Sequence, residues 1–396
     1  MKSIRELYTV GHGPSSSHTM GPQKACKVFK ERYPADRYQV ILYGSLSLTG
    51  KGHLTDYIIK QTLDNVDIVF SSEFIDVHPN TMDLMAYNND ELIGKARVYS
   101  IGGGAIRFEN MVHAATPDVY PHQSFDAIKA YCEQENIRLY DYVKRFEGPE
   151  IDEFLMTVWD VMQASIQEGL SQEGYLPGTL QVQRKAKQLI EKKIKNEPRE
   201  ILESRLVSAY AFAVNETNAG GGKIVTAPTC GASGTLPAVL KAMQDRHKFN
   251  NKAIIRALAT ASVIGNLIKH NASISGAEAG CQAEIGSACS MAAAAHAELF
   301  KLSLNQIEYA AEIALEHHLG LTCDPILGYV QIPCIERNAV AALRAIDACG
   351  LAYFLSDSRK ISFDLIVETM FETGRDMPSN YRETSCGGLA IKYRLK

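Results

Sequence analysis

The stretch EIGSACSMAAAAHAEL, residues 284–299, decides the larger part of the fold. It is apolar on nearly every side, which is typical of a helix enclosed by other helices. Apolar residues recur at helical spacing through most of the chain after residue 123. The expected helices are residues 124–146, 150–169, 179–195, 198–215, 233–246, 251–268, 284–302, 304–319 and 338–355. We therefore predict a large all-α domain over residues 123–396.

The first 122 residues have a different pattern. β-rich stretches separated by turn residues occur at residues 38–46, 66–74, 81–88 and 91–104, and helical spacing occurs at 22–32 and 55–63. This mixture predicts an α+β N-terminal domain, residues 1–122, with a small antiparallel sheet. Residues 105–122 read as its connector to the helical domain.

Composition narrows the class of protein. Hydrophobic residues make up 46% of the chain and charged residues 22%, which is ordinary for a soluble globular protein. A net charge of −4 provides no basic surface for nucleic acid or an anionic membrane. No apolar run reaches the ~18–20 residues of a membrane helix, and the start MKSIRELYTVGHG lacks the apolar stretch of a signal peptide. We expect a cytoplasmic protein without nucleic-acid or membrane partners.

The chain has nine cysteines, an odd number that indicates reduced thiols rather than a disulfide framework. Cys281, Cys323 and Cys334 lie in or beside glycine-rich polar loops, which suit ligands. Their spacings of 42 and 11 residues match neither zinc ribbons nor ferredoxins. From spacing alone, a metal site and ordinary buried cysteines are equally good interpretations. Cys26, Cys132, Cys289 and Cys349 are expected in the core, whereas Cys230 lies in a loop where it could face a ligand.

Two N-terminal segments gather polar side chains. In GPSSSHTMGP, residues 13–22, Ser15, Ser16, Ser17 and His18 precede a helix and could cradle a carboxylate, although one hydroxyl could be only a helix cap. In TGKGHLTD, residues 49–56, Lys51 could supply a cation and His53 a general base. The alternative for this second segment is a turn that leads into a helix capped by Thr55 or Asp56.

Two glycine triplets, at residues 102–104 and 220–222, suggest a phosphate cradle and hence a pyridoxal phosphate enzyme. Neither triplet matches the motif of a P-loop or of a dinucleotide-binding fold. We therefore interpret them as tight turns or close-packing positions.

Long segments of the chain resemble the iron–sulfur-dependent L-serine dehydratases, or L-serine ammonia-lyases, in their single-chain form. The segments are GPSSSHTMGP (13–22), YGSLSLTGKGHLTD (43–56), SIGGG (100–104), GGKIVTAPTCGASGTLPAVL (221–240), NASISGAEAGCQAEIGSACSMAAAA (271–295), LTCDPILGYVQIPCIERNA (321–339) and ETSCGGLA (383–390). The resemblance implies a lyase that converts L-serine to pyruvate and ammonia with a 4Fe–4S cluster as Lewis acid. It also implies an oxygen-sensitive homodimer.

Residue by residue, the resemblance implies that Cys281, Cys323 and Cys334 are the cluster ligands. It places His18, Ser15, Ser16, Ser17, Lys51, His53 and Thr55 toward the substrate, and Asn271 and Ser273 near the substrate or the cluster. His53 is our first choice for the base that removes the α-proton, followed by Lys51 and His18.

Two departures from the family pattern are notable. Cys230 stands where relatives often carry Asn or Ala, and its role stays open. Some relatives end in a cysteine that caps the cluster, whereas this chain ends GGLAIKYRLK, with Cys386 inside the preceding motif. Three thiolates would then leave one iron open for substrate, as catalytic zinc sites keep an open position.

Other readings remain open at this point. The same cluster could serve elimination on L-cysteine or L-threonine, and the sequence separates these substrates poorly. A pyridoxal phosphate lyase would need a lysine that forms an aldimine. A non-catalytic iron–sulfur sensor or electron carrier would have no need of the polar segment 13–56.

Overall fold

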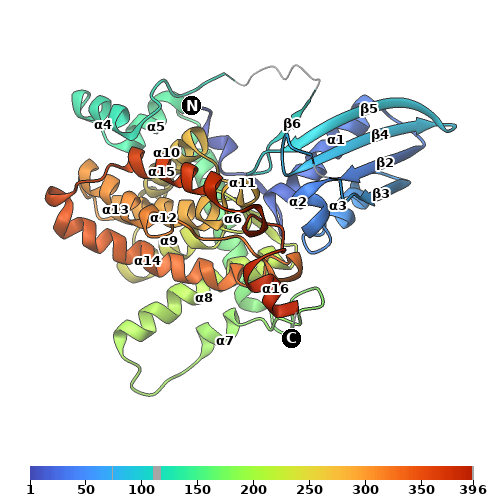
Figure 1. Ribbon diagram of the computed structural model, residues 1–396. Helices are drawn as coiled ribbons and strands as arrows, with labels where there is room; N and C mark the ends of the chain where they lie inside the picture. The colour runs from blue at the N-terminus through green and yellow to red at the C-terminus, as the bar shows by residue number, and fades with distance from the viewer. Residues whose placement is uncertain (74, 110–116, 395–396) are drawn as a thin grey trace.

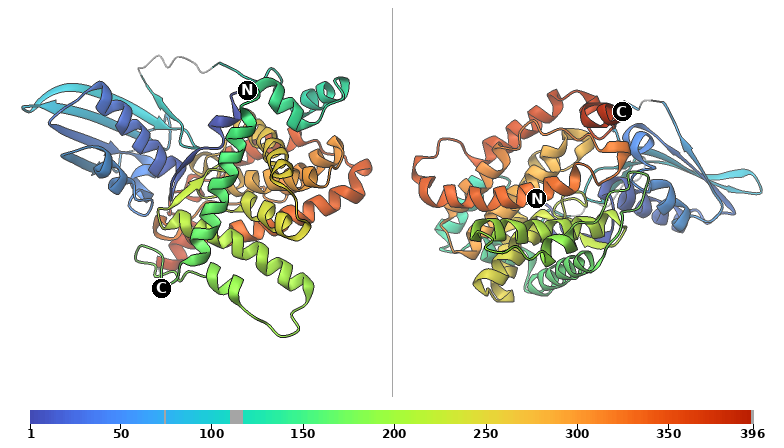
Figure 2. Two further views of the ribbon diagram at one scale, coloured as in Figure 1. Left: turned by 180° about the vertical axis from the view of Figure 1, so that it is seen from behind. Right: turned by 90° about the horizontal axis from the view of Figure 1, so that it is seen from below.

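In the computed structural model, residues 1–73, 75–109 and 117–394 are described. A small sheet with its helices forms one part of the molecule, and a large helical body forms the other (Figure 1). The two further views show the sheet projecting to one side of the helical body (Figure 2). The prediction of an α+β region followed by a large helical region is therefore confirmed. The domain boundary after residue 122 stays a prediction.

The sheet has five strands in the order β3-β2-β4-β5-β6. These are β2 (Arg37–Leu42), β3 (Val66–Phe70), β4 (Thr81–Asn88), β5 (Glu91–Ser100) and β6 (Ile106–Phe108). The pairs are antiparallel except for β2 with β3, which are parallel. The parallel pair arises because the chain between these strands forms α2 (Gly44–Thr49) and α3 (Thr55–Thr62) and must cross over.

Burial alternates along β2, so that Tyr38, Val40 and Leu42 are buried and their neighbours are partly exposed. The buried face is covered by α1 (Gly21–Arg32), through Phe29, and by α3, through Ile59. This small core positions two segments, residues 13–20 before α1 and residues 50–54 between α2 and α3, on the side that faces the helical body.

The helical body is built around α12 (Ser287–Leu299), every residue of which is buried. The surrounding helices are α4 (Phe125–Gln134), α5 (Leu139–Glu147), α6 (Ile151–Ser171), α7 (Ala186–Glu191), α8 (Arg199–Ala219), α9 (Thr235–His247), α10 (Asn251–Asn271), α13 (Leu304–Glu316), α14 (Cys334–Leu355), α15 (Phe363–Asp376) and α16 (Gly388–Arg394). Helices α9, α10, α13 and α14 pack directly on α12. The alanine run allows this close approach on all sides, as the sequence predicted.

Two expected helices were wrong in extent. The stretch 124–146 is divided into α4 and α5, because Asn136 adopts a left-handed conformation with φ of 52°. The stretch 179–195 retains only α7, because Gln181 is also left-handed and Gln183 forms a β-bridge with Tyr175. Lysines 192, 193 and 195 after α7 are exposed and have no apolar face to bury.

The N-terminus ties the two parts together. Ile4, Leu7 and Tyr8 are buried in the core of the helical body. Strand β1 (Val10–His12) then pairs antiparallel with β7 (Lys223–Val225). The chain therefore reaches the junction between the two parts at residue 13, where the serine-rich segment begins.

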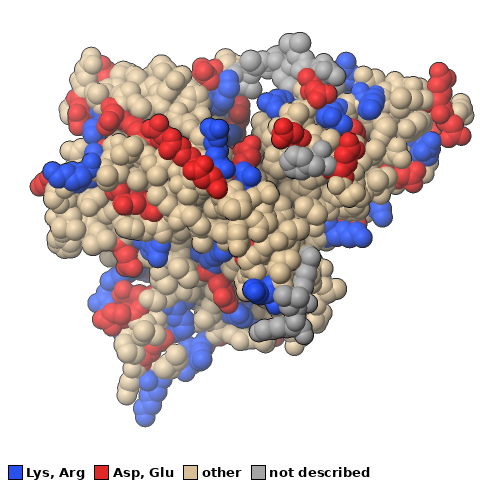
Figure 3. Space-filling view, viewed as in Figure 1, with Lys and Arg blue, Asp and Glu red and all other residues tan. Residues whose placement is uncertain are grey.

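Among the described helices, the segment Cys334–Ser358, which contains α14, is long and apolar enough to cross a membrane by length and composition alone. It packs against α8, α9, α12 and α13, while Val340, Leu351 and Phe354 along it are exposed. On the face drawn in Figure 3, acidic and basic side chains are interspersed.

Candidate active site

Three cysteines from separate segments of the helical body lie close enough for their charges to interact. Cys281 follows Gly280, which has a φ of 73°, and precedes a short π-helical turn, η3 (Gln282–Gly286). The backbone N–H of Cys323 donates to the carbonyl of Tyr381 at 2.8 Å. Cys334 is the first residue of α14. All three side chains are buried, which suits a bound group and excludes bulk water.

The charges of these thiols interact. A hydrogen bond from the Cys323 thiol, and the nearby guanidinium of Arg337, hold the pKa of Cys281 below its ordinary value. Burial and the charge of Cys281 raise the pKa of Cys334. Arg337 is fixed by donating to the carbonyl of Thr322 at 2.7 Å. The site thus favours one thiolate beside a cation, and further deprotonation would accompany binding of a positively charged metal group.

A carboxylate lies beside the thiols. Glu284, in η3, has an oxygen 4.0 Å from Cys323 Sγ, and its other oxygen accepts from the Thr229 hydroxyl at 2.8 Å. The ligand atoms of Cys281, Glu284 and Cys323 all lie within 4.8 Å of one another, as a metal site requires. Burial, and the charge of Cys281, raise the pKa of Glu284.

Gly276 leaves space at this position. A β-carbon there would lie 2.6 Å from a carboxylate oxygen of Glu284 and 3.2 Å from Cys323 Sγ. We expect Gly276→Ala to displace these groups and to lower activity by on the order of tenfold to a hundredfold. Gly350→Ala, in α14, is the matched control, because a β-carbon there meets nothing within 4 Å. Equal activity and equal metal content in the two variants would contradict this role for Gly276.

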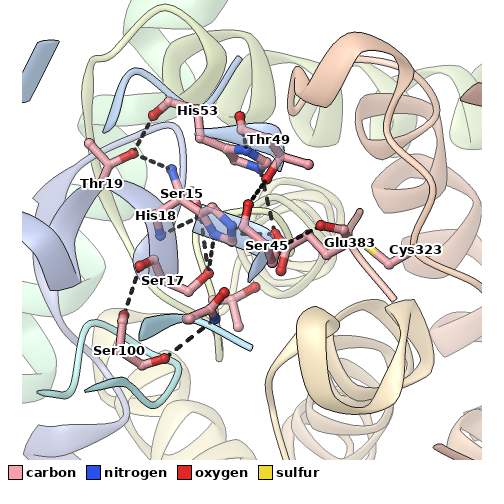
Figure 4. A network of polar contacts seen from close by, with 12 residues as sticks. Ser15, Ser17, His18, Thr19, Ser45, Thr49, His53, Ser100, Cys323 and Glu383 are labelled. Carbon is pink, nitrogen blue, oxygen red and sulfur yellow. Dashed lines mark hydrogen bonds and ion pairs between the residues drawn. The ribbon is translucent and has the colours of Figure 1, made fainter. Parts of the chain in front are cut away.

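A histidine pair lies across the junction from the thiols (Figure 4). The rings of His18 and His53 stack with centroids 4.3 Å apart. Both approach Glu383, whose Oε1 lies 3.7 Å from His18 Nδ1 and 3.5 Å from His53 Nε2. The backbone N–H of Glu383 donates to the carbonyl of Cys323 at 2.8 Å, so the same loop touches both clusters.

Hydrogen bonds assign the tautomers of the two rings. His53 Nδ1 lies 3.0 Å from the carbonyl of Thr49, which can only accept, so Nδ1 carries the proton and Nε2 keeps its lone pair. The Ser45 hydroxyl donates to the carbonyl of Glu383 at 2.6 Å and therefore accepts from His18 Nε2 at 3.0 Å. His18 Nδ1 then accepts from the Ser17 hydroxyl at 2.8 Å. Both nitrogens of His18 are engaged, whereas His53 Nε2 faces only a carboxyl group.

Burial sets the protonation of these groups. It lowers the pKa of His53 to about 4, so the ring is neutral at pH 7. Burial and the adjacent His53 also lower the pKa of His18. Burial, Glu284 and Cys281 raise the pKa of Glu383. The His53–Glu383 pair can therefore hold a proton on the carboxyl group while His53 Nε2 remains a base.

The serine-rich segment forms a buried π-helical turn, η2 (Ser16–Met20). The Ser15 hydroxyl accepts from the backbone N–H of His18 at 3.1 Å and lies 3.3 Å from the Ser17 hydroxyl. The Thr55 hydroxyl donates to the carbonyl of His18 at 2.6 Å. These bonds place Ser15, Ser17 and Thr55 beside His18, and Ser16 is buried in the same turn. Contact of these hydroxyls with a substrate stays a prediction.

Comparison with known proteins identifies the family of this chain. Residues 3–66 match the family described as "Serine dehydratase beta chain", and residues 83–390 match "Serine dehydratase alpha chain". The chain belongs to the serine dehydratase family. "L-serine dehydratase 1" and "L-serine dehydratase 2" of Escherichia coli (strain K12) are 43% and 41% identical to it, with 99% of each chain covered. "L-serine dehydratase" of Streptomyces coelicolor is 38% identical over 98% of each chain.

Some predicted site residues of this serine dehydratase family member lie apart from the two clusters. Lys51 is exposed, with Nζ 5.4 Å from the centre of the Phe70 ring. Asn271 is exposed and donates to the carbonyl of Gln123 at 2.8 Å. Ser273 is buried, but its hydroxyl is bonded to Glu278. The Cys230 thiol lies 3.3 Å from Met20 Sδ, and Cys386 is exposed.

Sequence reasoning missed Glu284, Arg337 and Glu383 as site residues of this serine dehydratase family member. Each is a charged residue in or beside a segment that carried the family resemblance, and each is held near a thiol or an imidazole. The sequence feature that could have identified them is a charged side chain inside a segment rich in small residues. This feature is a poor guide to a site, because most charged side chains are exposed to solvent.

Proposed function

We propose that this protein eliminates water from L-serine to give 2-aminoacrylate, which takes up water to yield pyruvate and ammonia, with a 4Fe–4S cluster bound by Cys281, Cys323 and Cys334. The observation that carries the proposal is the meeting of two residue sets at one buried junction. One set is Cys281, Cys323 and Glu284, with Cys334 near enough for its charge to act on Cys281 and Arg337, and the other is His53, His18 and Glu383. The names of the curated relatives supply the substrate.

The residues fit a cluster of this kind. Thiolates are the usual ligands of iron–sulfur clusters. Arg337 offsets their negative charge, and the absence of a β-carbon at Gly276 leaves space beside Cys323. When bound with one iron open, a cluster supplies a Lewis acid that polarises the serine carboxylate and hydroxyl.

His53 is the proposed base. Its Nε2 lone pair takes the α-proton, while the N–H on Nδ1 stays bonded to the Thr49 carbonyl and fixes the ring. Glu383 orients the ring from the other side. Loss of the α-proton and of hydroxide leaves 2-aminoacrylate, which hydrolyses to pyruvate and ammonia.

The hydroxyls are the proposed contacts of the substrate. Ser15 and Ser17 lie beside His18, Ser16 is buried in the same turn, and Thr55 fixes the backbone of His18. Ser273 is a less direct candidate, because its hydroxyl is already bonded to Glu278. Lys51 and Asn271 are weaker candidates in this proposal because both are exposed.

Location and assembly complete the proposal. Reduced thiols and a cluster suit the cytoplasm. A homodimer is supported by the outward face of α14, where Val340, Leu351 and Phe354 are exposed. A pyridoxal phosphate mechanism is disfavoured because Lys51 and Lys223, the lysines beside glycine-rich turns, are exposed.

The test of substrate is the release of products from amino acids by anaerobically prepared protein. We expect kcat/KM for L-serine to exceed the values for L-threonine and L-cysteine by about tenfold or more, because an enclosed site discriminates by the added methyl and by the larger sulfur. D-serine, which presents its α-proton on the wrong face to His53, is the matched control. Faster sulfide release from L-cysteine than pyruvate release from L-serine would overturn the assignment.

A further inference from the structure

A groove of about 570 Å³ lies between the sheet part and the helical body, next to the buried site. The sheet part contributes Ser45 and Asp76 to its walls. The helical body contributes Glu278, Arg375, Arg382 and Thr384. The groove therefore lies at the boundary between the two parts and is open to solvent.

The groove is separated from the site by a single layer of residues. Ser45, which lines it, accepts from His18 Nε2 and donates to the carbonyl of Glu383. Thr384 in the groove directly follows Glu383. His18, His53 and Glu383 are each at most 5% exposed. Any substrate must therefore pass between residues that enclose the site. Ser45 and Thr384 separate the groove from His18 and Glu383 by one residue.

Three of the four charged residues that line the groove have no ion-pair partner among the described residues, whereas the fourth, Glu278, lies beside His78. Within the described part of the chain, Arg375, Arg382 and Asp76 take part in no ion pair. Arg382 donates from Nη1 to the carbonyl of Glu278 at 3.2 Å, and its Nε is buried without a hydrogen-bond partner. A buried guanidinium N–H without an acceptor is unfavourable unless a ligand supplies one.

We propose that this groove is a binding site for a small amino-acid zwitterion and the route by which it reaches the buried site. The ligand's carboxylate binds Arg382 and Arg375, and its ammonium group binds Asp76. A guanidinium presents a planar set of donors that matches a carboxylate. The identity of the ligand rests on the proposed function, because L-serine is such a zwitterion. Its binding in the groove is a separate claim.

Cys386 provides a direct readout, because it lines the groove and is the one exposed cysteine of the nine. The experiment measures the rate of Cys386 alkylation by a maleimide in anaerobic holoenzyme. The probes are L-alanine, which has no hydroxyl to eliminate, propionate, which lacks the ammonium group, and ethylamine, which lacks the carboxylate. We expect L-alanine to slow alkylation at concentrations where the other two have little effect.

The variants make the test specific. Arg375→Glu should raise the L-alanine concentration for half-protection by about threefold or more, because it replaces an attractive charge with a repulsive one. Lys252→Glu, the same charge change at an exposed position in α10, should leave it unchanged. Cys386→Ser should abolish rapid labelling and so confirm the site of reaction.

Absence of protection by L-alanine, or equal protection in Arg375→Glu and the unmodified protein, would overturn the groove proposal. Protection is measured without turnover. A protein that is protected but releases no pyruvate from L-serine would contradict the proposed function and leave the groove proposal standing. A protein that converts L-serine to pyruvate but shows no protection by L-alanine would contradict the groove proposal and leave the proposed function standing.

Discussion

Replacing Cys334 with alanine is expected to remove the cluster and pyruvate release together. Cys334 begins α14 and lies near enough to Cys281 for the charge of Cys281 to raise its pKa, so it is the proposed third ligand. With two thiolates left, an iron atom loses its protein ligand and the remaining charges are poorly balanced. We expect iron content to fall to a small fraction of the unmodified value and turnover to become undetectable.

The control lies on the same helix. Cys349 is also buried in α14, and its pKa is raised by burial alone, without a charged neighbour. Cys349→Ala removes one buried sulfur of the same kind and should retain iron and most activity, with a loss of stability of about 1 kcal/mol. Equal iron content in Cys334→Ala and Cys349→Ala would contradict the assignment of Cys334 as a ligand.

Replacing His53 with alanine is expected to abolish turnover while the cluster stays in place. His53 offers a free Nε2 lone pair, whereas both nitrogens of His18 are engaged by hydroxyls. Loss of a general base lowers rates by about 10²–10⁴-fold. Iron content and visible absorption should match those of the unmodified protein, because His53 contacts none of the three cysteines by hydrogen bond.

Three comparisons check this role. His317→Ala changes an exposed histidine and should retain activity. If Lys51 were the base instead, Lys51→Ala would cause the loss and His53→Ala would not. The pH profile is the third comparison. Protonation removes the lone pair, so activity is lost as the pH falls. With the pKa of His53 at about 4, kcat/KM should stay level well below pH 6.5, and a loss centred near 6.5 would contradict the buried base.

The fold could be predicted from the sequence where the local residue pattern matches the burial that the structure shows. The alanine run of α12 predicted a helix enclosed on all sides, and the β-rich stretch at residues 38–46 predicted the strand that forms as β2. Helix ends were less accessible, because Asn136 and Gln181 adopt left-handed conformations that no apolar period reveals. The parallel pairing of β2 with β3 depends on the crossover through α2 and α3, which is a tertiary property.

The candidate site was accessible only in part. Cys281 lies well before Cys323 and Cys334 in the sequence, and only folding brings all three close enough for their charges to act on Arg337. Glu383 could not be identified as a site residue from the sequence, again because only folding brings it to the other groups. Its position between His53 and the carbonyl of Cys323 depends on a loop that closes over both parts of the molecule. Lys51 shows the opposite case, since its glycine-flanked setting suggested a site and the structure places it at the surface.

The central claim is that three buried cysteines hold an iron–sulfur cluster that this protein needs for elimination from L-serine. It is tested most directly by anaerobic purification, followed by analysis of iron and acid-labile sulfide per chain alongside pyruvate release. The account predicts about four iron atoms and four sulfides per chain, with activity that is lost in proportion to iron on exposure to oxygen. A preparation free of iron that still converts L-serine to pyruvate would contradict it.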